Sequence, residues 1–143
     1  MTTATLFWVL SLSSFLINAA SPLCDGSSCL SNEMAIDSVS RFEGRIAAFF
    51  GAPYAIAVDS ATHGLELSLR YLKDHERLRE NVVLEIPTRT EMSVSFLPEK
   101  LGMEWVWKEE RWEDFYYIGG TPVVDAAMLW REDSYITGTF MVS

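Results

Sequence analysis

Short apolar runs alternate with longer segments of helical periodicity along most of this chain, and this alternation limits the folds that it can adopt. Apolar residues recur at helical spacing over residues 32–51, and Gly51 and Pro53 then end the helix before the strand-like run 54–58. The alternation continues, with helices predicted over 62–78 and 90–101 and strands over 82–87, 103–107, 121–127 and 135–143. Strands separated by helices need crossover connections, so we predict an α/β fold with a mainly parallel sheet and flanking helices.

The N-terminal segment does not follow this alternation. Residues 6–21 are an apolar run followed by small residues, which resembles the core and cleavage region of a signal peptide, but residues 1–22 contain no Lys or Arg. Three interpretations stay open: a signal peptide, an ordinary buried helix, or sequence upstream of the true start codon. The turn-rich stretch 21–32 follows, so we divide the chain into residues 1–30 and an α/β domain at 31–143.

Composition and charge limit the classes of partner. With 49% hydrophobic and 22% charged residues among 143, the chain has the composition of one globular domain. A formal net charge of −9 without a basic stripe argues against nucleic acid and against an anionic membrane surface as partners. Cys24 and Cys29 are too few for a disulfide scaffold; they form either a small-loop disulfide in an oxidising compartment or two free thiols in the cytoplasm.

A cluster of small polar residues, 59–64, lies where the predicted strand 54–58 passes into a helix. Ser60 or Thr62 can cap that helix, which is the common role of such residues. The N-terminus of a helix also offers N–H groups and the positive end of its dipole to an anion such as phosphate. Ligands of parallel sheets bind at the carboxyl ends of the strands, so this cluster and Asp125 are expected to face one site.

Residues 108–120 combine acidic and aromatic side chains and are expected to form a loop. Either the loop is solvated with its rings tucked into the core, or its acids and rings line a sugar site.

A family resemblance begins at residues 41–72, which read RFEGRIAAFFGAPYAIAVDSATHGLELSLRYL. This stretch resembles the opening of the DegT/DnrJ/StrS sugar aminotransferases, which have F-E-x-x-x-A-x-x-F-G, an apolar strand, and then S-G-T-x-A-L or S-A-T-x-G. The similarity continues in the family's order through VVLEIPTRT (82–90), TPVVDAA (121–127) and TGTFMVS (137–143). It implies that residues 31–143 are an incomplete large domain of a pyridoxal-phosphate-dependent transferase of fold type I.

The resemblance also implies a reaction and partners. The complete protein would use pyridoxal 5′-phosphate to transfer an amino group from a donor such as glutamate to a nucleotide-linked keto-sugar, in nucleotide-sugar biosynthesis. Relatives are homodimers, so a homodimer is expected for the complete form. We expect a cytoplasmic protein, with secretion through residues 1–20 as the alternative.

Particular residues receive roles from the resemblance. The backbone N–H groups of Thr62 and His63, with the Thr62 hydroxyl, would hold the phosphate of the cofactor. Asp125 would contact the pyridine nitrogen and keep it protonated, which lets the ring accept electrons. Ser143 matches a serine that assists the phosphate. No metal site is expected, because His63, His75 and the two cysteines show no zinc spacing.

The chain departs from the family pattern at four places. Glu91 lies near the position of an aromatic residue that stacks on the cofactor, and Met128 stands where the family often has Gln or His. Thr62 and Asp125 are closer in sequence than in full-length members. The Schiff-base lysine of the family is expected a few residues beyond Ser143.

The lysines of this chain are Lys73, Lys100 and Lys108, and none has the sequence context of the family's lysine. We therefore expect this chain to be the N-terminal part of an aminotransferase-like protein that does not transaminate as given. Two alternatives stay open. One is a non-catalytic relative that binds a sugar nucleotide or a partner subunit. The other is a small secreted binding protein, cleaved near residue 20 and carrying a Cys24–Cys29 disulfide.

Overall fold

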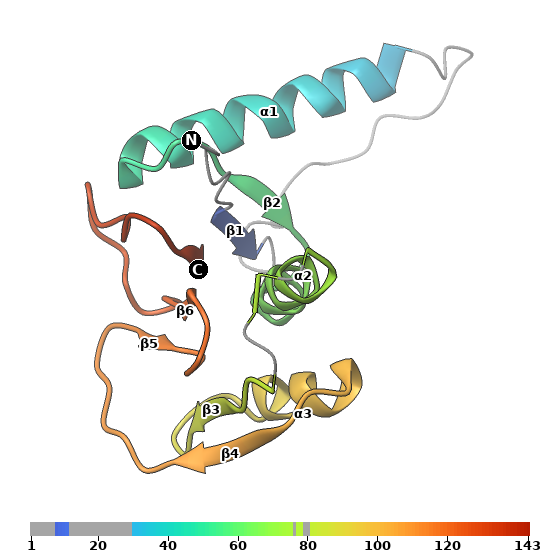
Figure 1. Ribbon diagram of the computed structural model, residues 1–143. Coiled ribbons are helices and arrows are strands. Elements are labelled where there is room, and N and C mark those ends of the chain that lie inside the picture. The colour runs from blue at the N-terminus through green and yellow to red at the C-terminus, as the bar shows by residue number, and fades with distance from the viewer. Residues whose placement is uncertain (1–7, 12–29, 76, 79–80) are drawn as a thin grey trace.

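A mostly parallel five-stranded sheet, a parallel two-stranded sheet and three helices are present in the part of the chain that the computed structural model describes, which is residues 8–11, 30–75, 77–78 and 81–143. In chain order the elements are β1 (Trp8–Ser11), α1 (Leu30–Phe50), β2 (Ile56–Val58), α2 (Ala61–Asp74), β3 (Leu84–Pro87), α3 (Met92–Leu101), β4 (Trp105–Lys108), β5 (Tyr116–Tyr117), β6 (Val123–Asp125) and β7 (Phe140–Val142) (Figure 1). The predicted α/β class is confirmed.

The larger sheet has five strands in the order β2-β1-β7-β6-β5. Its first four strands are parallel, and β5 alone runs antiparallel to its neighbour β6. Helix α2 lies against β1, β6 and β7 of this sheet. The carboxyl ends of the four parallel strands therefore lie at one edge, and α2 begins at that edge.

The smaller sheet consists of β3 and β4, which run parallel because α3 forms the crossover between them. An antiparallel bridge joins it to the segment that follows β5: the Glu85 N–H donates to the Gly119 carbonyl at 3.2 Å, and the Gly119 N–H donates to the Glu85 carbonyl at 2.9 Å. A Cβ atom on Gly119 would lie 2.4 Å from the Cβ of Glu85. Only glycine therefore allows the two sheets to approach this closely.

Helix boundaries agree with the predicted stop signals. Helix α1 ends at Phe50 before Gly51, whose φ of 69° is left-handed, and α3 ends before Gly102, whose φ of 61° is also left-handed. Helix α2 stops at Asp74, four residues before the predicted end at Leu78.

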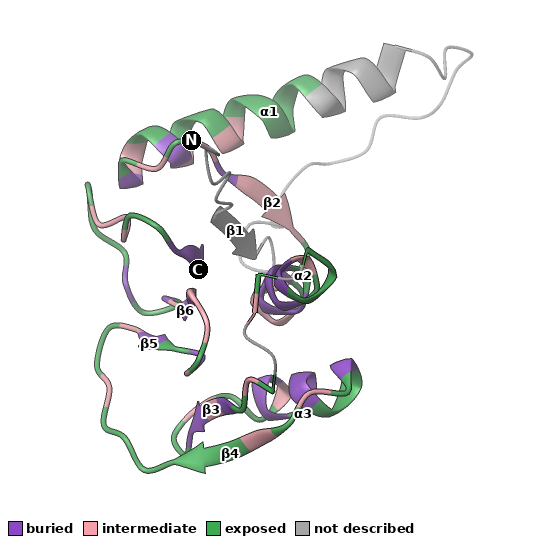
Figure 2. Ribbon diagram, in the orientation of Figure 1, coloured by how far each residue is buried: buried purple, intermediate pink, exposed green. Residues whose placement is uncertain are grey.

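Two hydrophobic clusters form the core. The inner face of α2, made of Leu65, Leu69 and Leu72, is fully buried. It belongs to the first cluster, with buried residues from α3, β3, β5, β6 and β7. The second cluster joins the end of α1 to β6 and β7 through Ala47, Phe50, Ala55, Val124, Ala126, Leu129 and Met141. Figure 2 shows that, over residues 37–50 of α1, the buried positions lie at the C-terminal end, while α2 turns a buried face to the sheet.

The structure corrects two expectations. The buried-helix interpretation of the N-terminal run is wrong for Trp8–Ser11, which form β1 between β2 and β7. A short apolar run has no periodicity that separates a strand from a helix, so its partners decide the outcome. The segment expected as a loop contains β5, because Tyr116 and Tyr117 pair with Asp125 and Val124. The remaining positions of the signal-like run, and Cys24 and Cys29, lie outside the described residues.

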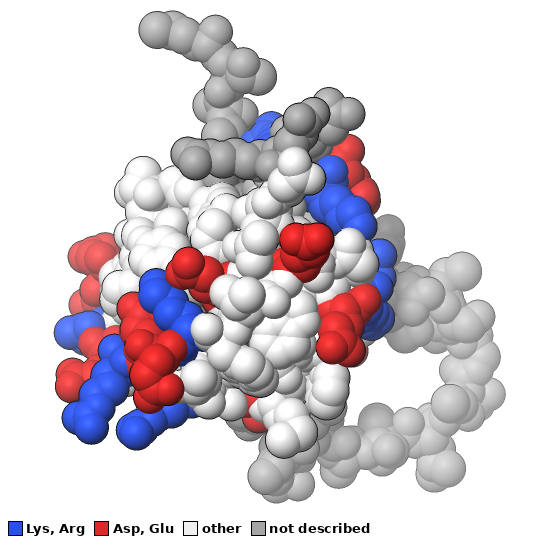
Figure 3. All heavy atoms as spheres, turned by 60° about the horizontal axis from the view of Figure 1, so that its bottom comes forward, with Lys and Arg blue, Asp and Glu red and all other residues white. Residues whose placement is uncertain are grey.

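The surface carries both signs of charge. In the view of Figure 3, acidic and basic side chains lie next to one another around a broad uncharged area. Ion pairs join Arg131 to Asp114 at 2.6 Å and Lys108 to Glu85 at 3.2 Å. Within the described ranges, no helix combines the length and the apolar character needed to cross a bilayer.

Candidate functional site

The four residues predicted to bind the cofactor lie at the carboxyl edge of the larger sheet. Thr62 and His63 are in the first turn of α2, directly after β2. Asp125 is the last residue of β6, and it pairs in register with Val142, so that Ser143 follows β7 at the same edge. The topology thus brings these four residues to one side of the fold, as the order of the elements predicts.

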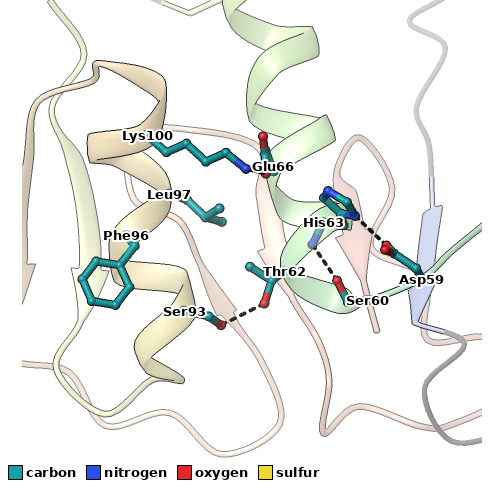
Figure 4. Close-up of a pocket in the computed structure, with 9 residues that line it drawn as sticks. All are labelled: Asp59, Ser60, Thr62, His63, Glu66, Ser93, Phe96, Leu97 and Lys100. Atoms are coloured by element: carbon teal, nitrogen blue, oxygen red, sulfur yellow. Dashed lines mark hydrogen bonds and ion pairs between the residues drawn. The ribbon is translucent and has the colours of Figure 1, made fainter.

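Ser60 caps the N-terminus of α2. Its side-chain oxygen accepts the His63 N–H at 3.2 Å, and its carbonyl accepts the Gly64 N–H at 3.0 Å (Figure 4). The Thr62 hydroxyl is hydrogen-bonded to the Ser93 hydroxyl at 2.8 Å. Ser60 therefore has the capping role that the sequence left open. Its capping bond uses the His63 N–H, which is one of the N–H groups that the resemblance assigns to the phosphate.

His63 also contacts an acid in the residues before the helix. Its Nδ1 lies 2.6 Å from Oδ1 of Asp59, and both side chains are largely exposed. The hydrogen bond to His63 lowers the pKa of the Asp59 carboxyl below its usual value. This pair places a carboxylate beside the helix N-terminus. An anion bound there would be repelled by the Asp59 charge and attracted by the helix dipole.

An open groove of about 390 Å³ runs between α2 and α3, and we call it the α2–α3 groove. Two contacts between the helices cross it: the Thr62–Ser93 hydrogen bond, and an ion pair in which Lys100 Nζ lies 2.7 Å from Oε2 of Glu66. The groove is lined by Asp59, Ser60, Thr62, His63, Glu66, Ser93, Phe96, Leu97 and Lys100 (Figure 4). It thus contains the start of α2, whereas Asp125 and Ser143 are not among its lining residues.

Glu66 is a buried carboxylate on the floor of this groove. Hydrogen bonds from Lys100 and from Arg70, whose Nη2 lies 2.8 Å from Oε1, lower the pKa of Glu66 against the opposing effect of burial. Both partners remain about half exposed. The charge of Glu66 is therefore balanced by two cations: Arg70 pairs with it within α2, and Lys100 links it to α3.

Both carboxylate oxygens of Asp125 accept a hydrogen bond. The Tyr116 hydroxyl donates to Oδ2 at 2.5 Å, and the Ala127 N–H donates to Oδ1 at 3.2 Å. Burial raises the pKa of Asp125, although these two hydrogen bonds act in the opposite direction. The Tyr116 oxygen is in turn hydrogen-bonded to the hydroxyl of Thr90.

Tyr116 and Thr90 are the site residues that the sequence did not single out. Tyr116 is only 3% exposed and Trp112 packs against the same core, so these two rings of residues 108–120 point inward, whereas Tyr117 is exposed. Burial raises the pKa of Tyr116, and the charge of Asp125 raises it further, so the phenol stays a donor at physiological pH. The consecutive aromatic residues Phe115, Tyr116 and Tyr117 are a strand signal, because aromatic residues are enriched in strands, but they do not show which side chain faces the core.

The positions that depart from the family pattern are exposed. Glu91 precedes α3 and makes no side-chain capping bond, and the side chain of Met128 is largely exposed, with 68% accessible. Each lysine contacts a partner other than Asp125: Lys73 the carbonyl of Leu101, Lys100 Glu66, and Lys108 both Glu85 and Glu110. Among the described residues, no group of three or more His, Cys, Asp or Glu side chains is arranged to hold a metal ion.

Comparison with known proteins gives one match. Residues 30–88 match the family model of the DegT/DnrJ/EryC1/StrS aminotransferase family. The matched segment includes α1, β2, α2 and β3, and therefore Thr62 and His63, but it ends before Asp125 and Ser143. Searches among curated proteins and among solved structures each found no match. The predicted resemblance to the DegT/DnrJ/EryC1/StrS aminotransferase family is thus confirmed over residues 30–88.

Proposed function

We propose that this chain is part of an aminotransferase-like protein that binds pyridoxal 5′-phosphate at the carboxyl edge of its larger sheet. The observation that carries the proposal is the position of Asp125, a largely buried carboxylate at the end of β6, on the edge where α2 begins. We interpret the chain accordingly as an incomplete large domain of fold type I.

The residues at this edge fit the chemical groups of the cofactor. An ionised carboxylate has about four lone-pair sites, and Tyr116 and Ala127 use two of those on Asp125, so it can still accept a bond from a protonated ring nitrogen. The first turn of α2 and Ser143 would hold the phosphate. When bound, the cofactor supplies an electron sink for the carbanion formed at the alpha carbon of the substrate.

Thr62 is the residue on which phosphate binding most depends. Ser60 already accepts the N–H of His63, whereas the Thr62 hydroxyl can accept a hydrogen bond from Ser93 and donate its own proton to a phosphate oxygen. The Asp59 carboxylate nearby opposes an anion, and its ion pair with His63 offsets this charge when His63 is protonated.

The proposed substrates follow from the family alone. We propose that the complete protein aminates a nucleotide-linked keto-sugar in the cytoplasm, with glutamate as amino donor and a homodimer as the assembled form. Lys73, Lys100 and Lys108 contact other partners, so we propose that binding by these 143 residues is non-covalent.

The Asp125→Asn variant tests the role of the carboxylate. Loss of a charged hydrogen bond to the ring nitrogen should raise the dissociation constant for pyridoxal 5′-phosphate by at least about tenfold. Titration followed by absorbance measures this constant. The control is Asp114→Asn, an exposed aspartate paired with Arg131, which should bind as the unmodified chain does. Equal affinities in the two variants would contradict the proposed role of Asp125.

A second candidate function is favoured by Glu91 and Met128. Both side chains are exposed, Glu91 cannot stack on a cofactor ring, and Met128 cannot donate a hydrogen bond to it as Gln or His can. A relative with these substitutions would keep the fold to bind a sugar nucleotide or a partner subunit. An absence of any absorbance change or stabilisation with pyridoxal 5′-phosphate would favour this function.

A further inference from the structure

A chain of side-chain hydrogen bonds links the two sheets at the candidate site. Thr90 lies between β3 and α3, Tyr116 lies on β5, and Asp125 ends β6. Tyr116 and Asp125 are direct partners across the antiparallel β5–β6 pair, so their side chains lie on the same face of the sheet. Three segments that are separate in sequence are thus joined through the Tyr116 hydroxyl.

The direction of these bonds follows from the number of protons available. The Tyr116 hydroxyl has a single proton and donates it to Oδ2 of Asp125. Its oxygen can therefore only accept from the hydroxyl of Thr90, which is hydrogen-bonded to it. The Ala127 N–H holds the other oxygen of Asp125, so the carboxylate is fixed at both ends.

We propose that Tyr116 is a positioning residue for Asp125, and that Thr90 holds the Tyr116 hydroxyl in the orientation that this requires. The purpose of this arrangement rests on the proposed function, in which Asp125 must present its remaining lone pairs to a cationic ring nitrogen. A purely structural ring at this site would need no hydroxyl, and phenylalanine would fill the same core position. The hydroxyl is needed because the partly buried carboxylate would otherwise lose a donor.

The Tyr116→Phe variant of the full chain tests this inference, with Tyr117→Phe as its control. Tyr117 is the next residue of the same strand, is 43% exposed and faces the other way. Removal of the Tyr116 hydroxyl should raise the pKa of Asp125, because the bond to this hydroxyl lowers it against burial. The Asp125 carboxyl is followed by carbon NMR, with its signal assigned from Asp125→Asn. Glu91, whose charge acts on Tyr116, is followed in the same titration.

The titration separates this inference from the proposed function. An Asp125 pKa that is unchanged in Tyr116→Phe overturns the inference, whether or not the unmodified chain binds the cofactor. A raised pKa in Tyr116→Phe but not in Tyr117→Phe supports it. A failure of the unmodified chain to bind pyridoxal 5′-phosphate contradicts the proposed function alone.

A second variant covers the case in which Tyr116→Phe does not fold. Thr90→Val removes only the hydroxyl that donates to Tyr116, at a half-buried position. Its Asp125 pKa should rise less than that of Tyr116→Phe, and no rise in a folded Thr90→Val variant would overturn the role of Thr90. Where the unmodified chain binds the cofactor, we expect about a tenfold weaker dissociation constant in Tyr116→Phe.

Discussion

Glu66 is a buried carboxylate and Asp125 a partly buried one, and their surroundings change their pKa in opposite directions. Bonds from Lys100 and Arg70 lower the pKa of Glu66 below its usual value of 4.5, so the folded state favours the ionised form. Burial raises the pKa of Asp125 above its usual value of 3.8, so the folded state favours the protonated form. Glu66 therefore stabilises the fold above pH 4.5 and loses this effect as the pH falls, whereas the stability contributed by Asp125 is lost as the pH rises above 3.8.

Glu66→Gln should show this dependence on pH. At neutral pH, where Glu66 is ionised, the variant should lose about 1–2 kcal/mol of unfolding free energy, because two charge-assisted bonds become neutral ones. Near pH 3 the difference from the unmodified chain should be smaller. Urea denaturation at both pH values measures it, with the exposed residue Glu99 replaced in Glu99→Gln as control. An equal loss at the two pH values would show that the contribution of Glu66 to stability comes from packing and not from its charge.

The candidate site was partly predictable from single residues. Thr62, His63, Asp125 and Ser143 reach one edge because each follows or ends a parallel strand, which the order of elements already implies. Tyr116 was not predictable in this way, because its bond to Thr90 joins residues 26 positions apart across two sheets. Such a contact depends on strand pairing, which cannot be read from a local sequence pattern.

At the scale of elements, periodicity predicted the helices and most strands in their correct order. It failed for β1 and β5, which are short and whose identity depends on distant partners. Strand β1 pairs with Ile56 and Val142, and β5 is only two residues long. The link between the two sheets at Gly119 was also not visible, because a glycine in a predicted loop gives no sign of the strand that it approaches.

Gly119→Ala should weaken this link. The added Cβ would lie 2.4 Å from the Cβ of Glu85, so the backbone must shift and the two bridge hydrogen bonds must lengthen. We expect a loss of about 1–3 kcal/mol of unfolding free energy. Gly44→Ala is the matched control: Gly44 lies inside α1 with no atom within 4 Å of its added Cβ. That control should be stabilised by about 0.5–1 kcal/mol. If Gly119→Ala, like the control, lost no unfolding free energy, the close contact between Gly119 and Glu85 would be contradicted.

At the scale of the whole molecule, the topology explains why one edge collects the candidate binding groups. Four parallel strands end there, and α2 begins there while packing on β6 and β7. The family match covers the half of this edge that contains the start of α2, and Asp125 comes to it from a later part of the chain. The proposed cofactor site therefore requires that both halves act on one ligand, with the phosphate at α2 and the ring at Asp125.

The most direct test compares pyridoxal 5′-phosphate with pyridoxal, which lacks the phosphate, in thermal unfolding of the unmodified chain. The account predicts that the phosphorylated compound raises the melting temperature in proportion to the logarithm of its concentration, and that pyridoxal at equal concentration has a much smaller effect. It also predicts that Asp125→Asn reduces this stabilisation. Equal effects of the two compounds, or none from either, would contradict a cofactor site built from α2 and Asp125.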